Sequence, residues 1–202
     1  LDACGDSRPM LRLYVLLLGE TGMRCESEAL WLRWEDVDLA EGFLWIASGR
    51  GGHRTKSGKG RWAPMTDRLA AAIKDHFASY HFATYGSGEA AHRSPWVFHH
   101  LMSWRRRVAG ERIVSLRNGF ERAASRAKLP DRFRQHDLRH RRVTQWLAEG
   151  QSAALVQEAM GHSDLRTTLG YSHLARTHLK ALVARTSSTS PPDQDSASSA
   201  TA

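Results

Sequence analysis

Apolar residues recur every three or four positions along much of this sequence, a spacing that predicts amphipathic helices with one buried face. The stretches with this pattern cover residues 8–20, 27–38, 67–80, 113–127 and 140–150, the segment that ends at Gly161, and a run from 173 to 185. Gly22 and Gly161 stand where two of these helices stop, as glycine often does at a helix C-terminus. Thr66 can cap the helix at 67–80.

Two short apolar runs interrupt the helical pattern and predict an antiparallel hairpin. Its strands are expected over residues 42–47 and 61–65, with a glycine-rich, basic loop over residues 49–60 between them. This loop does not match a P-loop, because Gly60 stands where that motif has serine or threonine. Residues 81–94 predict a loop and residues 96–98 a short strand. The expected fold class is α+β, mostly α-helical with a small antiparallel sheet.

Composition narrows the class of protein. At 202 residues with 41% hydrophobic content, the chain can bury one good core. Two cysteines are too few for disulfide bonds to stabilise a domain of this size, which favours a reducing compartment such as the cytoplasm. No stretch approaches the length of a membrane span. The net charge of +8 favours a polyanionic partner, and the Ser, Thr and Pro content of residues 186–202 predicts a disordered tail.

Polar residues replace apolar ones just before the helix at 140–150. Helical steps backwards from Val143 along its apolar face lead to His136, Arg139 and His140. Polar groups on an inward face cost free energy unless they meet a partner or line a site. Taken alone, His136 and Arg139 fit satisfied, half-buried basic residues at the start of a helix.

The sequence that follows favours a catalytic interpretation. Gly161 and His162 form a turn after an apolar segment, Ser163 can cap the next short helix, and Tyr171 comes nine residues after His162. This order of His-x-x-Arg, a helix, Gly-His and a tyrosine resembles the C-terminal half of the catalytic domain of tyrosine recombinases, the phage integrase family. The resemblance is specific over residues 136–174.

Two upstream segments extend the resemblance. The sequence from Thr21 to Arg24 looks like the family's first motif, whose arginine clamps phosphate, although Glu28 lies four residues after Arg24 where the family usually has three. Residues 55–58 resemble the hairpin of the family's catalytic lysine, which points to Lys56, with Lys59 the weaker candidate. Without the resemblance, Arg24 fits an exposed loop arginine, and Lys56 fits a solvated loop that contacts DNA phosphates nonspecifically.

The resemblance implies DNA strand cleavage without a metal or other cofactor. Tyr171 would attack the phosphate and form a 3′-phosphotyrosyl bond, two arginines would bind the phosphate oxygens, and Lys56 would protonate the 5′ oxygen. The histidines could trade protons or hydrogen-bond the phosphate. The implied catalytic residues are Arg24, Lys56, His136, Arg139, His162 and Tyr171. The eleven histidines lack cysteines and carboxylates at zinc-ligand spacing, so we also expect no metal site.

The resemblance also implies an architecture and partners. Residues 1–185 would form the catalytic domain. Family members normally carry a helical core-binding domain ahead of it, which we expect to lie outside this sequence. The partner would be double-stranded DNA at the nucleoid, bound by a protein of bacterial or phage origin that forms a homo-oligomer, a tetramer in the family.

Two alternatives remain open at this point. One is a DNA-binding accessory module of the same fold that has lost cleavage, which the extra residue after Arg24 favours. The other is an activity like that of type IB topoisomerases, which share the chemistry. The short spacing between His162 and Tyr171 looks more like a recombinase.

Overall fold

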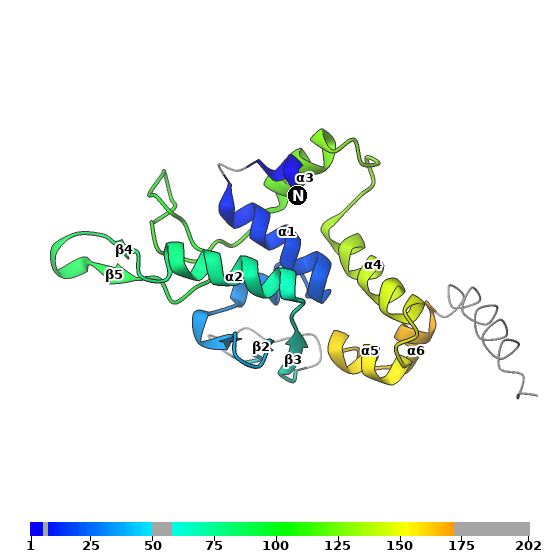
Figure 1. The fold of residues 1–202 in the computed structure, drawn as a ribbon. Coiled ribbons are helices and arrows are strands. Elements are labelled where there is room, and N and C mark those ends of the chain that lie inside the picture. Colours follow the sequence, from blue (N-terminus) through cyan, green and yellow to red (C-terminus); the bar gives the residue numbers. More distant parts are fainter. Residues whose placement is uncertain (6–7, 50–57, 172–202) are drawn as a thin grey trace, which may run out of the picture.

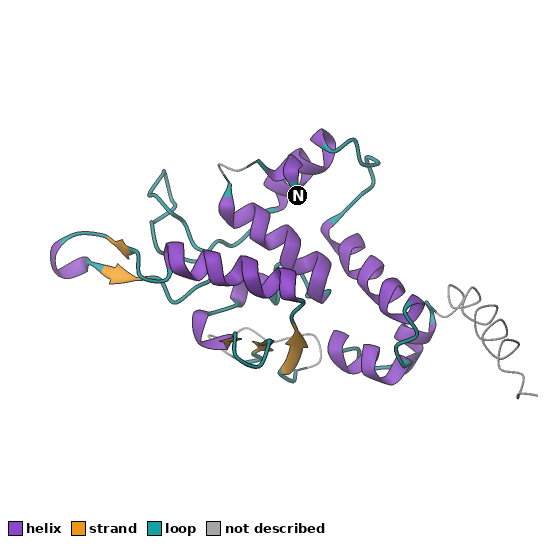
Figure 2. Ribbon diagram, viewed as in Figure 1, coloured by secondary structure: helices purple, strands orange, loops and turns teal. Residues whose placement is uncertain are grey.

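A computed structural model describes residues 1–5, 8–49 and 58–171 (Figure 1). Its α-helices are α1 (Pro9–Thr21), α2 (Asp67–Tyr80), α3 (Arg117–Arg126), α4 (Gln135–Ala148), α5 (Ala153–Met160) and α6 (Leu165–Leu169). Its strands are β1 (Val37–Asp38), β2 (Phe43–Ile46), β3 (Arg61–Pro64), β4 (Thr84–Tyr85) and β5 (His92–Arg93). Helices dominate the ribbon and the strands are short (Figure 2), which confirms the predicted fold class.

Helix α1 is the centre of the core. Apolar side chains are buried around most of its circumference, including Leu13, Tyr14, Leu17 and Leu18, and a helix that is apolar on all sides must be covered on all sides. Helices α2, α3 and α4 pack against it, and Figure 1 shows it between them. The helix ends where Gly22 takes the left-handed conformation with φ 64°. Its C-terminus lies beside α4, because Arg139 of α4 donates to the Gly22 carbonyl.

The main sheet is antiparallel, with strand order β1-β2-β3. Leu44 pairs with Ala63, and both face the core, whereas Trp45 and Trp62 pair on the other face. Side chains alternate between the two faces of a strand. The alternation places Arg61 on the buried face of β3, at a position that an apolar residue would normally take.

The helix predicted within residues 27–38, ahead of an acidic turn, is wrong. That segment forms two 3-10 turns, Ala29–Trp31 and Trp34–Asp36, followed by β1. Backbone groups of Leu32 and Trp34 bond instead to Val97 and Pro95, and a β-bridge joins Arg33 to Trp96. These long-range hydrogen bonds replace the local ladder of an α-helix, so tertiary pairing overrides helical propensity here.

Other expected boundaries also change. Helix α3 begins at Arg117 rather than near 113, and the loop at 81–94 contains the β4–β5 hairpin. Residues 96–98 do not form a strand: Trp96 makes an isolated bridge to Arg33, and residues 97–98 form a bend. Asp164, not Ser163, caps α6, because its carboxylate accepts from the Arg166 N–H at 2.9 Å. Thr66 does cap α2, and Gly161 does end α5.

Some predictions fall on residues that the structure does not describe. Lys56, the apolar run at 173–185 and the tail at 186–202 lie outside the described residues. Among the helices that are described, none is both long and apolar enough to cross a membrane.

Candidate active site

The C-terminal end of α5 is where three arginines from separate elements converge. Each donates to one of the last backbone carbonyls of the helix: Arg61 Nε to Ala159 O at 3.0 Å, Arg139 Nη2 to Met160 O at 2.6 Å, and Arg24 Nη2 to Gly161 O at 3.5 Å. The last carbonyls of a helix have no partner within it and carry the negative end of the helix dipole. The end of α5 therefore gathers guanidinium groups from the loop that follows α1, from β3 and from α4.

Arg139 joins the ends of two helices. It is 4% exposed, and its Nη1 also donates to the Gly22 carbonyl at 2.5 Å, so one planar group bridges α1 to α5. Burial, reinforced by the charge of Arg24, lowers the pKa of Arg139 to about 10. The guanidinium thus remains charged at neutral pH although its side chain is buried.

Glu28 orients the other two arginines. Its buried carboxylate accepts from Arg61 at 2.8 and 2.9 Å and from Arg24 Nη1 at 2.5 Å. Burial alone would raise the pKa of Glu28, but the hydrogen bonds and charges of Arg61 and Arg24 outweigh burial and hold this pKa at about 2. The backbone N–H of Arg24 also donates to Glu28 at 2.9 Å. The extra residue between Arg24 and Glu28 is therefore absorbed in a turn that keeps the two side chains paired.

Arg61 is a site residue that the sequence analysis missed. In the sequence it is only the first residue of an expected strand. Arg61 lies two residues before Ala63 in the strand, so both side chains point to the same, inward face. A charged residue at such a position could have indicated a site. The partner of Arg61 could not be found in this way, because Glu28 is 33 positions away.

Two glycines make this close packing possible. A Cβ on Gly161, whose φ is +62°, would lie 2.9 Å from the Arg61 side chain. A Cβ on Gly22, whose φ is +64°, would lie 2.4 Å from the end of the Met160 side chain. Any other residue at either position would strain the backbone, and at position 161 it would also press against the Arg61 side chain.

His162 follows Gly161 and lies half-buried among the arginines. Its Nδ1 is 2.9 Å from Oγ1 of the buried Thr168, which fixes the ring. Burial, together with the charges of Arg139 and Arg24, lowers the pKa of His162 to about 4. His136, exposed on the first turn of α4, also has a lowered pKa, caused by desolvation and then by His140 and Arg139. The cluster of positive charge thus favours neutral imidazoles in the site.

Tyr171 lies just after α6, at the edge of the same cluster. Its backbone N–H donates to Thr168 O at 3.1 Å, and its ring packs against the small apolar cluster between α4 and α5 that contains Val143. The hydroxyl is hydrogen-bonded to Nδ1 of His140. Burial raises the pKa of Tyr171, and the nearby charge of Arg139 opposes this rise. The phenol is therefore protonated at neutral pH, and its hydroxyl is already in contact with an imidazole.

Of the six predicted site residues, Arg24 and Arg139 bond to the end of α5, where His162 follows Gly161. His136 and Tyr171 both contact His140 of α4, and Lys56 lies outside the described residues. Lys59, the weaker lysine candidate, lines a cavity of about 740 Å³ together with Arg61 and His162. Within the described part of the chain, no group of three His, Cys, Asp or Glu residues could hold a metal ion.

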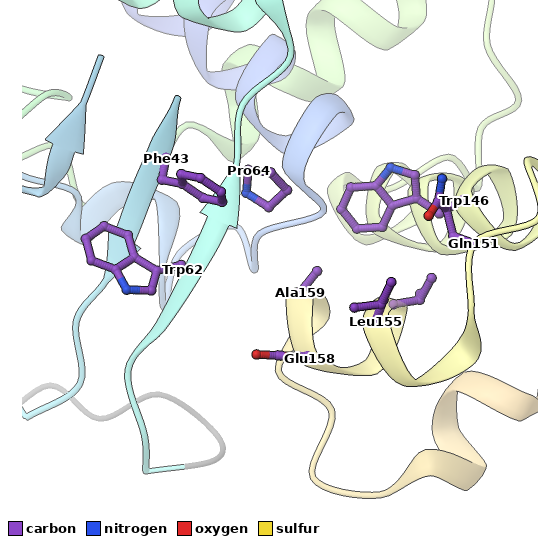
Figure 3. Close-up of a pocket in the computed structure, with 9 residues that line it drawn as sticks. Phe43, Trp62, Pro64, Trp146, Gln151, Leu155, Glu158 and Ala159 are labelled. Carbon is purple, nitrogen blue, oxygen red and sulfur yellow. The ribbon is translucent and has the colours of Figure 1, made fainter. Parts of the chain in front are cut away.

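A second cavity, of about 400 Å³, lies next to the site and is chemically different (Figure 3). Phe43, Trp62 and Pro64 of the strands face Trp146 and Leu155 of the helices across it. These side chains are mainly apolar. The cationic groups that could bind a phosphate lie at the end of α5 instead.

Comparison with known proteins identifies one family and its relatives. Residues 1–178 match the Phage integrase family. Tyrosine recombinase XerA of Pyrococcus furiosus is 30% identical over 177 residues, which cover 86% of this chain and 54% of that protein. The chain thus spans about half the length of this relative.

Solved structures share the fold. The crystal structure of XerA recombinase superposes with a TM-score of 0.67 at 22% identity, over 93% of this chain and 61% of the other. XerH site-specific recombinase, in a post-cleavage complex with palindromic difH substrate, gives a TM-score of 0.64 at 24% identity, over 89% and 46% of the two chains.

Proposed function

Because the chain belongs to the phage integrase family of tyrosine recombinases, we propose that it is the DNA-cleaving part of a site-specific recombinase. The observation that carries this proposal is the convergence of Arg24 and Arg139 on the end of α5, next to His162. The hydroxyl of Tyr171 is hydrogen-bonded to His140, the residue after Arg139 on α4. A phosphodiester is a single negative charge with two free oxygens, and a cluster of guanidinium forks matches it.

Tyr171 is the proposed nucleophile. Its oxygen forms a bond to phosphorus as the bond from phosphorus to the 5′ oxygen breaks, which leaves a 3′-phosphotyrosyl link and a free 5′ hydroxyl. The energy of the diester is kept in that link, so the 5′ hydroxyl of a partner strand can reseal the DNA without ATP. An ordinary tyrosine pKa of about 10 leaves the phenol protonated, so it needs a proton acceptor and a positive field.

Arg24 and Arg139 are proposed to bind the non-bridging phosphate oxygens. A guanidinium carries five N–H groups, and the described contacts of Arg139 use its two Nη atoms once each, which leaves donors for a phosphate. These interactions strengthen as charge moves onto the oxygens in the transition state. Neutral His136 and His162 can hydrogen-bond the same group without adding charge.

Lys56 is proposed to protonate the departing 5′ oxygen. The support is its sequence context, Thr55 to Gly58, in the loop between β2 and β3. Lys59 is the competitor, because it lines the cavity that contains His162. Lys56→Ala should slow strand cleavage much more than Lys59→Ala does. With a sulfur leaving group at the 5′ position, which needs no proton, Lys56→Ala should cleave at nearly the wild-type rate.

The proposed partner is double-stranded DNA, bound as a homotetramer with the help of a core-binding domain outside this sequence. The XerH structure in complex with its palindromic difH substrate supports the choice of DNA, as do the net charge of +8 and pI near 10.1. Such a complex would form in the cytoplasm at the nucleoid. Residues 173–185 are proposed to help the subunits assemble on DNA.

The experiment uses nicked duplexes with a randomised core. After cleavage, the short fragment between the cleaved phosphate and the nick, which carries the 5′ hydroxyl, diffuses away. Religation is then prevented, so covalent adducts accumulate and their DNA can be sequenced. Wild-type protein should yield an adduct that survives denaturation, and Tyr171→Phe should yield none. An adduct that persists in Tyr171→Phe would move the nucleophile elsewhere.

Two other outcomes would favour the alternatives. DNA binding without any adduct, even when a core-binding domain is supplied, would indicate an accessory module. Relaxation of supercoiled plasmid with no sequence requirement would indicate a topoisomerase.

A further inference from the structure

His140 contacts the hydroxyl of the candidate nucleophile, although it is not one of the six residues that the sequence motifs indicate. Its Nδ1 is hydrogen-bonded to the Tyr171 hydroxyl, and the two ring centroids are 5.6 Å apart. The contact joins residues 31 positions apart, so it is a product of the tertiary fold. We propose that His140 is the general base that takes the phenol proton when Tyr171 attacks DNA. This inference rests on the proposed function.

The geometry around His140 fixes its ring. His136 lies one helical turn earlier on α4, and the two imidazoles meet edge to face with centroids 4.5 Å apart. Tyr171 is held from the other side by its backbone hydrogen bond to Thr168. The acceptor and the donor are therefore anchored on separate elements, α4 and the turn after α6.

Other groups in the site are poorly suited to be the base. The Nδ1 of His162 is engaged by Thr168. The carboxylate of Glu28 is bound by two arginines, and a carboxylate stabilised in this way is a weak base. The lysine and arginine side chains of the site are cations and have no acceptor. His140 is the imidazole whose ring nitrogen meets the hydroxyl in the described structure.

The proton balance of the step is simple. The oxygen of Tyr171 bonds to phosphorus, its proton moves to His140 Nδ1, and the 5′ oxygen leaves with a proton from the general acid. Before the step His140 must be neutral, with its proton on Nε2 and the lone pair on Nδ1. In religation the oxygen of the 5′ hydroxyl bonds to phosphorus and gives its proton back to the general acid. The bond from phosphorus to Tyr171 breaks, and His140 returns its proton to the departing phenolate.

The contact itself can be tested without DNA. In protein labelled with ¹⁵N at histidine, the Nδ1 resonance of His140 reports whether it accepts a hydrogen bond. Tyr171→Phe removes the hydroxyl and should shift that resonance, while leaving the His162 resonances near their wild-type positions. An unchanged His140 resonance would overturn the proposal.

The base role is tested by adduct formation on the nicked duplexes selected by the wild-type protein. His140→Ala should slow it by about 10²-fold or more, the range of general acid-base catalysis. His140→Gln can still accept a hydrogen bond but cannot take up the proton, so it should be nearly as slow. Gln145→Ala, an exposed change on the same helix, should react like wild type. His140 is itself exposed, and thermal melting of each variant checks that the fold is retained.

A bypass reaction separates the base from the phosphate-binding groups. Hydrogen peroxide can attack the phosphate in place of the tyrosine in Tyr171→Phe, and this cleavage needs the arginines but no base beside residue 171. Adding His140→Ala to Tyr171→Phe should therefore leave the peroxide cleavage rate unchanged, whereas Arg139→Ala should abolish it.

The outcomes separate this inference from the function on which it rests. A wild-type rate of adduct formation in His140→Gln would overturn the base role. So would a peroxide reaction that His140→Ala slows as much as it slows adduct formation. Neither result would contradict the covalent adduct at Tyr171. Failure of the wild-type protein to form any adduct, or persistence of the adduct in Tyr171→Phe, would overturn the proposed function and this inference with it.

Discussion

Glu28→Gln is the sharpest test of how the site is held together. The change keeps the shape of the side chain and removes the charge that binds Arg24 and Arg61. The carboxylate is fully buried, and the side chains of its partners are 17% and 8% exposed. The variant thus leaves two mostly buried guanidinium groups without their shared anion.

The expected loss can be worked out in two ways. The fall in the pKa of Glu28 from 4.5 to about 2 corresponds to about 3 kcal/mol of folding free energy, at about 1.4 kcal/mol per tenfold change. Removing one partner of a buried ion pair costs about 3–5 kcal/mol in other proteins. Both routes predict that Glu28→Gln lowers the free energy of unfolding at neutral pH by about 3 kcal/mol.

The pH dependence follows from the sign of the pKa change. The pKa of Glu28 is lower in the folded protein, so its contribution is fully present above the unfolded value of 4.5 and is lost as pH falls towards about 2. The difference in unfolding free energy between wild type and Glu28→Gln should therefore be constant at neutral pH and shrink over that range.

The assay is urea unfolding followed by circular dichroism at a series of pH values. Glu121→Gln is the matched control, because Glu121 also pairs with an arginine four residues away, Arg117, but both side chains are exposed. Exposed pairs of this kind contribute about 0.5 kcal/mol. The control should change stability by no more than that.

Two results would refute this reasoning. If Glu28→Gln is as stable as Glu121→Gln at neutral pH, the buried carboxylate does not stabilise the arginines. If the loss of stability is large but does not change down to pH of about 2, it arises from packing rather than from charge. We also expect Glu28→Gln to lower the adduct yield, since Arg24 loses the partner that orients it.

Three further predictions concern the surroundings of the site. Gly161→Ala should lower the free energy of unfolding by more than Gly150→Ala, as measured by thermal melting, because both have positive φ but only the first would bring a Cβ against Arg61. Arg139→Lys should cost about 2 kcal/mol or more in urea unfolding and remove adduct formation, since one ammonium cannot reproduce the two bonds to Gly22 and Met160. His162 should titrate near its lowered pKa of about 4 by NMR. That pKa lies below the ordinary value of about 6.5, so the contribution of His162 to stability is fully present above about 6.5 and is lost as pH falls towards about 4. His162→Asn should not show this loss in melting curves measured over the same pH range.

Local sequence was sufficient to predict the elements whose signals lie within a few residues. The apolar spacing and end signals of α1, α2 and α5 predicted those helices to within a few residues, with Thr66 as a cap and Gly22 and Gly161 at the ends. The β2–β3 hairpin was likewise predicted by its two apolar runs. The residue types and their order also indicated the family, which the comparison with known proteins confirmed.

Only the tertiary structure decided how distant groups meet. The segment at 27–38 has a helical pattern, but its backbone bonds to residues 95–97 and the helix is lost. Arg61 reaches Glu28 and Ala159 across separations of 33 and 98 positions, and His140 reaches Tyr171 across 31. A periodic pattern reports which side of an element is buried, but it does not report which element lies opposite. Hydrogen bonds and charges act over a few ångströms of space, so the partners that set the chemistry of this site exist only once the chain has folded.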